Sequence, residues 1–390
     1  MDTRLHQIDL VRGFCLLNIF INHITISVLQ EASPSKLFLF DSADAFVFLS
    51  GISVMLAYGG SRRPADQTRQ LIWKRALHLY KVNLLVILAS AGILCLGYGL
   101  AQVPMLADHP VQLVGTHGVA SYLWHVLTMQ QTVGYSMVLR LYVFLMLVAP
   151  LYVWLASRRF WFPLLVAVPV WLLAGGFGLV ESDALSGTPL RLTVLPWNLP
   201  FAAGIVLGAA IVAKIELPRS RVLDVIVIVI AAVLPVGLAL ASSVDQTVLE
   251  WLDKRDEHFL FGASKTLQSP LRILSLVCAA YLLMRFTGAP VVRLLHGVGP
   301  ANVLCHLGRR SLSVFALGAV LALAANQILA AGHFRFGFET GGLAMVSLEI
   351  VLVLAGFLAM ALHAGWRPSL PRSAGPGSSA AFAPSDLPRL

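Results

Sequence analysis

The sequence predicts an all-α protein that crosses a membrane many times. Of its 390 residues, 58% are hydrophobic and only 12% are charged, and its mean hydropathy is +0.80. A soluble globular protein has about twice this charged fraction. Apolar runs of about 20 residues, long enough to cross the hydrocarbon core, recur along the chain. Because a helix satisfies its own backbone groups in lipid, we expect these runs to be helices.

The apolar runs predict about ten membrane-spanning helices. They lie at 8–29, 44–60, 77–102, 135–156, 160–180, 196–213, 222–242, 268–286, 311–332 and 341–364. Residues 103–134 contain a further semi-apolar stretch, which fits a re-entrant or interfacial helix. Residues 1–365 would then form one transmembrane domain. The remaining tail, 366–390, is rich in Pro, Ser, Gly and Ala, and we expect it to be disordered.

The distribution of Lys and Arg predicts the orientation. With a cytoplasmic N-terminus, 20 of the 28 basic residues fall on the cytoplasmic side and six on the opposite side. This bias favours both termini in the cytoplasm, as does an even number of spans. The same bias explains the net charge of +9 without a nucleic-acid partner. The four cysteines lack metal-type spacing, so we expect no metal site.

The first predicted span carries Asp9, Arg12, Asn18, Asn22 and His23. Ionisable groups within a bilayer are costly and therefore indicate a functional site. Arg12 and His23 are eleven residues apart, which puts them within about 20° of one helix face and about 16 Å apart along it. Asp9 is close enough to pair with Arg12. His23 fits a general base, although a hydrogen-bonded packing histidine is the alternative.

The second predicted span begins with two acids, Asp41 and Asp44. One of the two fits a helix cap; the other would orient His23 or bind the acceptor. Further along, Ser50-Gly51 would allow close contact with another helix. The basic segment 61–81, which includes Arg75, either reflects membrane topology alone or binds an anionic cytosolic ligand such as the phosphates of coenzyme A.

The first span resembles that of membrane acyltransferases of the acyltransferase-3 superfamily, in which an arginine, ten residues and a histidine form a signature; Arg12 and His23 fit it. The chain is more closely similar to the OpgC family. The similar stretches occur in the same order along the chain: Asp41 to Gly51, Trp197 to Gly204, Lys265 to Arg272 and Gly308 to Phe315. At position 44 this chain has Asp where that family has Glu.

The resemblance implies a bacterial inner-membrane acyltransferase that moves succinyl groups to osmoregulated periplasmic glucans. It implies acyl-CoA, in particular succinyl-CoA, as the donor, a glucan or other glycan as the acceptor, and no permanently bound cofactor. Besides these substrates, only membrane lipids are expected as partners. The catalytic candidates are His23, Asp44, Asp41 and Arg12. The substrate-binding candidates are Asp9, Asn22, Arg75, Trp197, Lys265 and Arg272, of which the last two would bind a succinyl carboxylate or balance the nearby acids.

A transporter or flippase of sugars or lipid-linked sugars is the alternative function. It would use the same polar face of the first span as a pathway, without acyl chemistry. Internal repeats and helices broken by Gly or Pro would favour it, and the sequence has no clear internal repeat.

Overall fold

The computed structural model describes residues 6–24, 28–31, 39–60, 64–101, 103, 109–216, 218, 220–242, 247, 259–260, 262, 264–285, 299 and 301–367. Among these residues the regular structure is helical, and one isolated bridge joins Ser182 to Pro189. The all-α prediction is therefore confirmed. The tail expected to be disordered lies outside the described residues from position 368 onward.

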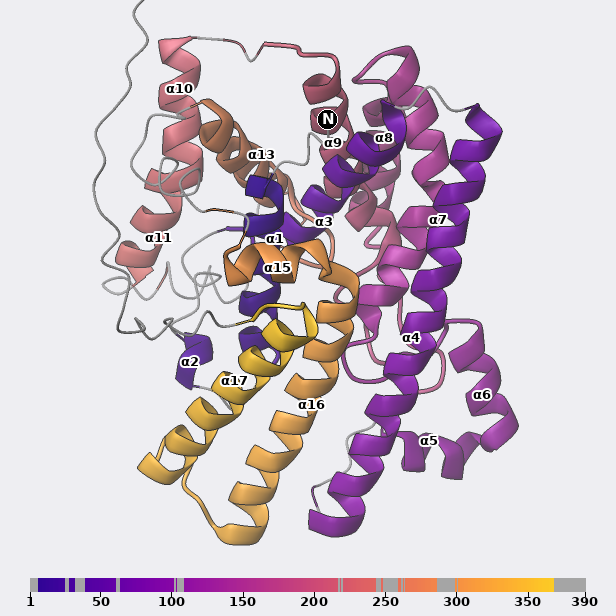
Figure 1. Ribbon diagram of the computed structural model, residues 1–390, viewed down its shortest axis with the longest axis vertical. Helices are drawn as coiled ribbons and strands as arrows, with labels where there is room; N and C mark the ends of the chain where they lie inside the picture. The colour runs from indigo at the N-terminus through magenta and orange to yellow at the C-terminus, as the bar shows by residue number, and fades with distance from the viewer. Residues whose placement is uncertain are drawn as a thin grey trace, which may run out of the picture.

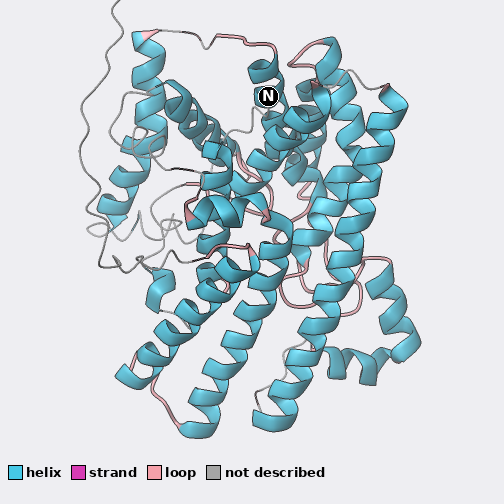
Figure 2. Cartoon of the chain, viewed as in Figure 1, coloured by secondary structure: helices cyan, strands magenta, loops and turns pink. Residues whose placement is uncertain are grey.

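The helices follow one another along the whole chain (Figures 1 and 2). They are α1 (His6–Asn22), α2 (Val28–Glu31), α3 (Ser42–Val54) with its π-helical continuation η2 (Met55–Gly59), α4 (Ala65–Ala101), α5 (Pro110–His117), α6 (Val119–Leu127), α7 (Met137–Arg158), α8 (Pro163–Gly176), α9 (Val194–Val212), α10 (Arg221–Ile228), η3 (Val229–Val233), α11 (Leu234–Ser242), α13 (Pro270–Arg285), α15 (Val303–Arg309), α16 (Ser311–Phe336) and α17 (Leu343–His363).

Seven helical segments of the described chain are long and apolar enough to cross a membrane. They are Ser42–Gly59, Ala65–Leu100, Met137–Arg158, Val194–Val212, Arg221–Leu238, Ser311–Phe336 and Leu343–His363. The protein is therefore a multi-pass membrane protein. The other three predicted spans are also helical, but α1, α8 and α13 have only 17, 14 and 16 residues. The expected first span of 8–29 was too long, because α1 ends at Asn22.

The stretch at 103–134, for which one further segment was expected, contains two short helices, α5 and α6. Figure 1 shows them beside the lower half of α4. Their exposed apolar side chains include Val119, Leu123 and Trp124. Two short helices separated by Gly118, which has a φ of +82°, replace the single semi-apolar segment, because this backbone conformation is outside the helical region.

Two helix crossings depend on glycines and fix the helices that carry the polar residues. A Cβ atom on Gly51 of α3 would lie 2.1 Å from the carbonyl oxygen of Phe201, and one on Gly204 of α9 would lie 2.0 Å from that of Phe48. The expected close helix contact at Ser50-Gly51 is therefore confirmed. In the same way, α1 crosses α15 where Gly13 and Gly308 face backbone, and a side chain at either position would overlap it.

Four helices, α1, α3, α7 and α16, meet in one apolar core at the centre of the molecule. Leu16, Phe46, Tyr142 and Phe315 are the buried members of this core that come from these helices in turn. On α1 and α3, polar side chains lie on both sides of this layer: Arg12 bonds to Ser53 on one side, and Asn18 bonds to Ser42 on the other. The apolar core therefore separates two polar regions, an inner pocket and an outer cluster.

Candidate active site

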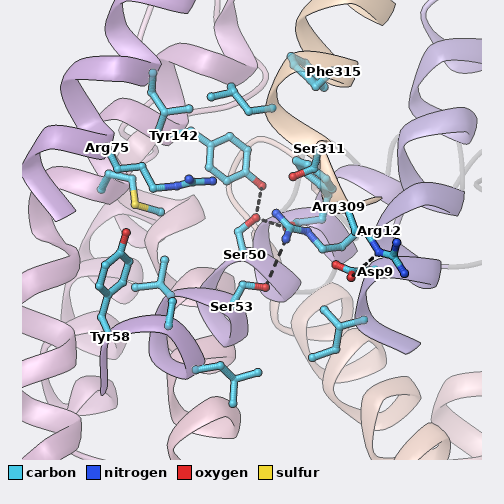
Figure 3. A pocket seen from close by; sticks show the side chains of 18 of the residues that line it. Asp9, Arg12, Ser50, Ser53, Tyr58, Arg75, Tyr142, Arg309, Ser311 and Phe315 are labelled. Atoms are coloured by element: carbon cyan, nitrogen blue, oxygen red, sulfur yellow. Dashed lines mark hydrogen bonds and ion pairs between the residues drawn. The ribbon is translucent and has the colours of Figure 1, made fainter. Parts of the chain in front are cut away.

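The inner pocket is a cavity of about 560 Å³ that opens among α1, α3, α4, α7, α15 and α16 (Figure 3). Its polar lining residues are Asp9, Arg12, Ser50, Ser53, Tyr58, Arg75, Tyr142, Arg309 and Ser311. Three residues predicted from the sequence, Asp9, Arg12 and Arg75, are thus brought together here. The fourth charged residue of the lining, Arg309 of α15, was missed.

The guanidinium group of Arg12 is part of the pocket lining. Its Nη1 atom is 3.5 Å from Oγ of Ser53, and its Cζ atom is 5.5 Å from the centroid of the Phe46 ring. A guanidinium over an aromatic face is attracted by the ring quadrupole. Asp9 forms an ion pair with Arg309, whose Nε atom is 3.8 Å from the carboxylate.

Arg75 enters the pocket from α4 and points toward its centre (Figure 3). Among the described residues its exposed side chain has no ion pair or hydrogen bond. The pocket therefore holds three guanidinium groups and one carboxylate among its described lining residues. Arginine binds phosphate and carboxylate groups through paired donors, so this lining is suited to an anionic ligand.

The outer cluster forms at the first turn of α3. Oδ1 of Asp41 accepts hydrogen bonds from the amides of Ala43 and Asp44, at 2.8 and 3.3 Å. Oδ2 of Asp44 accepts one from the amide of Asp41 at 2.8 Å. This reciprocal arrangement is a capping box. The prediction that one of the two acids caps this helix is therefore confirmed, but the capping box uses both of them.

Two cations from the segment before and within α13 neutralise these acids. Nζ of Lys265 lies 2.5 Å from Oδ2 of Asp41. Nη2 of Arg272 lies 3.2 Å from Asp41 and 2.6 Å from Asp44. Burial alone would raise the pKa of Asp41, which precedes the span, but the charges of Lys265 and Arg272 outweigh it and hold this pKa below its usual range. In this structure, both cations thus balance the acids.

Gln268 completes the outer cluster and was missed by the sequence analysis. Its Nε2 atom donates to Oδ1 of Asp44 at 2.7 Å, and Asp44 is fully buried. Gln268 has a left-handed backbone, with φ of +53°, and its carbonyl accepts a hydrogen bond from Trp171 at 2.7 Å. The one signal that pointed to it was its place between Lys265 and Arg272 in the motif.

His23 lies directly after the end of α1. Its ring stacks on Tyr135, with centroids 3.9 Å apart and an interplanar angle of 8°. Among the described residues, its ring nitrogens make no hydrogen bond, neither to Asp41 or Asp44 nor to any other group. The predicted orientation of His23 by one of these acids is therefore absent as a hydrogen bond. Asn18, one turn and a half earlier on α1, donates to Ser42 at 2.6 Å and joins α1 to α3.

The remaining two predicted residues lie apart from the inner pocket. Asn22 is the last residue of α1, and its carbonyl accepts a hydrogen bond from Gln30 at 3.4 Å. Trp197 is fully buried in α9 and is not among the residues that line the pocket. Its neighbour Asn198 accepts a hydrogen bond from Tyr152 at 2.5 Å, so this part of the motif belongs to the contact between α7 and α9.

The fold and the site are those of a multi-pass helical membrane protein. A cationic pocket lies beside the first half of α1, and a histidine follows the end of this helix. Comparison with known families is more specific. A model described as OpgC protein matches residues 4–369, so the chain belongs to the OpgC family. Membership implies a role in the succinylation of glucans. Searches of curated proteins and of solved structures found no match.

Proposed function

We propose that this protein is a transmembrane O-acyltransferase of the bacterial inner membrane. It would move a succinyl group from cytosolic succinyl-CoA to a hydroxyl group of a periplasmic glucan or another glycan. The observation that carries the proposal is that Arg12, in the first half of α1, lines a cationic pocket, while His23 follows the end of the same helix, eleven positions later. Membership of the OpgC family indicates succinyl transfer as the reaction that the pocket and His23 would carry out.

The donor would bind in the inner pocket. The Lys and Arg bias favours both termini in the cytoplasm, and in that orientation this pocket would face the cytosol. Arg12, Arg75 and Arg309 would bind phosphate groups of the acyl-CoA, because guanidinium groups form charge-assisted hydrogen bonds with them. Asp9 would hold Arg309 in place through their ion pair.

The acyl group would be transferred at His23. A neutral imidazole takes the proton of a glycan hydroxyl, and the hydroxyl oxygen attacks the thioester carbonyl carbon. A C–O bond forms, the C–S bond breaks, and the departing thiolate of coenzyme A takes the proton from His23. Because Arg12 and His23 are about 16 Å apart along α1, the donor's flexible arm would have to extend from the pocket past Phe46.

The outer cluster would have a structural role on the side of the protein where the acceptor binds. Asp41, Asp44, Lys265 and Arg272 are engaged with one another, so their part would be to hold the start of α3 beside the end of α1. His23 would then be the group that meets the acceptor hydroxyl. This assigns proton transfer to His23 and a supporting role to the two acids.

The test compares purified His23→Gln with the unaltered protein in detergent, supplied with succinyl-CoA and a glucan. We expect coenzyme A release and glucan succinylation, followed by mass spectrometry, to fall by a factor of about 100 or more, the usual size of a general-base contribution. His117→Gln is the matched control, because His117 is exposed on α5. A well-folded His23→Gln protein with normal turnover would disprove the mechanism. Glycan movement without any coenzyme A release would instead support the transporter.

A further inference from the structure

The carbonyl group of His23 is held by two side chains from distant parts of the chain. A helix leaves its last carbonyl groups without backbone partners, and α1 ends at Asn22. The His23 carbonyl oxygen accepts hydrogen bonds from the hydroxyl of Tyr135 and from Nδ2 of Asn326, the latter at 2.8 Å. Asn326 also donates to the Tyr135 hydroxyl at 2.9 Å. The three groups therefore form a closed network.

Tyr135 also fixes the plane of the imidazole. The two rings are nearly parallel, 8° apart, with centroids separated by 3.9 Å. A catalytic base is usually oriented by a third group that hydrogen-bonds to its ring. His23 has no such ring hydrogen bond among the described residues. Instead, His23 is oriented by the hydrogen bonds to its carbonyl group and by the stacking of Tyr135 on one face of its ring. Neither contact uses a ring nitrogen, so both nitrogens are available to a substrate.

The groups that hold His23 are themselves well anchored. Tyr135 lies in a turn in which the amide of Val133 donates to Oγ of Ser136 at 2.9 Å. Gly134, within this turn, has a φ of +58°, a conformation that glycine adopts at little cost. Asn326 lies in the long helix α16. The amide of His23 still donates to the carbonyl oxygen of Ile19 in α1 at 3.0 Å, and two separate elements hold its carbonyl group.

We propose that Tyr135 and Asn326 are positioning residues for His23 in the acyl transfer reaction. The inference rests on the proposed function, because it names the groups that orient the same base. They act by fixing the backbone and the ring plane of His23, so that a ring nitrogen meets the acceptor hydroxyl. Neither residue needs to touch the donor in the inner pocket.

The test measures kcat and the KM for succinyl-CoA in Tyr135→Phe, Tyr135→Leu and Asn326→Ala. Tyr135→Phe keeps the stacked ring and loses the hydroxyl, with its hydrogen bonds to the His23 carbonyl and from Asn326, so we expect kcat to fall about ten-fold. Tyr135→Leu loses both and should fall further, while the KM for succinyl-CoA stays unchanged in all three. Because the two side chains share one acceptor, the effects of Tyr135→Phe and Asn326→Ala should not add.

Tyr80→Phe is the matched control, since its hydroxyl donates to the carbonyl oxygen of Leu127 at 2.8 Å, away from His23. It should lose the same kind of bond and keep its kcat. Wild-type kcat in Tyr135→Leu and Asn326→Ala, with His23→Gln inactive, would overturn the positioning role alone. An active His23→Gln would overturn the proposed function itself. If Tyr135→Leu fails to fold, Tyr135→Phe and Asn326→Ala decide the question by the same criterion.

Discussion

The inner pocket and the outer cluster both place arginines and carboxylates beside α1 and α3, yet they pair their charges differently. Among the described residues that line the pocket, Arg12, Arg75 and Arg309 face one carboxylate, that of Asp9, around a cavity of about 560 Å³. In the cluster, two acids meet two cations at 2.5 to 3.2 Å, and Asp44 is fully buried. An excess of one charge around a cavity suits a ligand, whereas a matched and buried set supports a fold.

His23 belongs to neither the inner pocket nor the outer cluster. It lies at the end of α1 and contacts Tyr135 and Asn326 rather than the acids of the cluster. Charged residues close to a catalytic candidate are therefore not necessarily its catalytic partners. Five substitutions test this difference between the two regions, beginning with His23→Gln described above, which should have the largest effect.

The next largest effect is expected from Arg272→Met, which leaves the buried carboxylate of Asp44 without its cation. Breaking a buried pair in this way costs about 3–5 kcal/mol, so the detergent-solubilised protein should unfold at a markedly lower temperature. The double variant Arg272→Met with Asp44→Asn should recover part of this loss. Arg191→Met, at an exposed site, is the control. An unchanged melting temperature in Arg272→Met would show that the cluster does not stabilise the fold.

Gly204→Leu should affect the inner pocket and the outer cluster together. Its new Cβ atom would lie 2.0 Å from the carbonyl oxygen of Phe48, forcing α9 away from α3. Overpacking of this kind costs about 1–3 kcal/mol, and α3 carries both Ser53 of the pocket and Asp44 of the cluster. We expect lower stability and lower kcat together, measured by thermal unfolding and turnover. Gly176→Leu, where a Cβ atom meets nothing within 4 Å, should change neither.

Arg75→Gln should weaken donor binding without affecting the fold. Hydrogen bonds to charged groups are worth about 1.5–3 kcal/mol, so the KM for succinyl-CoA should rise at least ten-fold. Because Arg75 is exposed and has no ion pair among the described residues, the melting temperature should stay the same. Lys74→Gln, one residue earlier on α4, is the control. A KM unaffected by Arg75→Gln would remove this residue from the donor site.

The smallest effect is a pH dependence of stability from Asp41. Its pKa is lower in the folded protein than the ordinary value of 3.8, so folding favours the charged form. The stabilisation is complete above about pH 4 and is lost as the pH falls further. The melting temperature should therefore decline less steeply below pH 4 in Asp41→Asn than in the unaltered protein. Parallel curves would show that Lys265 and Arg272 do not favour the charged carboxylate.

Much of the fold was predicted from the sequence because its causes are local. Apolar runs of sufficient length predict helices, and all ten predicted segments are helical. A cap by one of the acids Asp41 and Asp44 was also predicted, because Asp next to a helix N-terminus satisfies its free amide groups; that both acids form a capping box was not predicted. The length of α1 was not, since its end at Asn22 depends on partners that satisfy the next carbonyl, and these lie far along the chain.

The amino-acid sequence alone was enough to predict a helical membrane protein and to single out Arg12 and His23, eleven residues apart. It also marked Asp9 and Arg75, which the fold brings into the same pocket. Helix packing determines which further residues line the pocket and surround His23. It added Arg309 to the pocket and set Tyr135 and Asn326 on His23, because hydrogen bonds and ion pairs depend on distance in space, which helix packing determines across hundreds of residues.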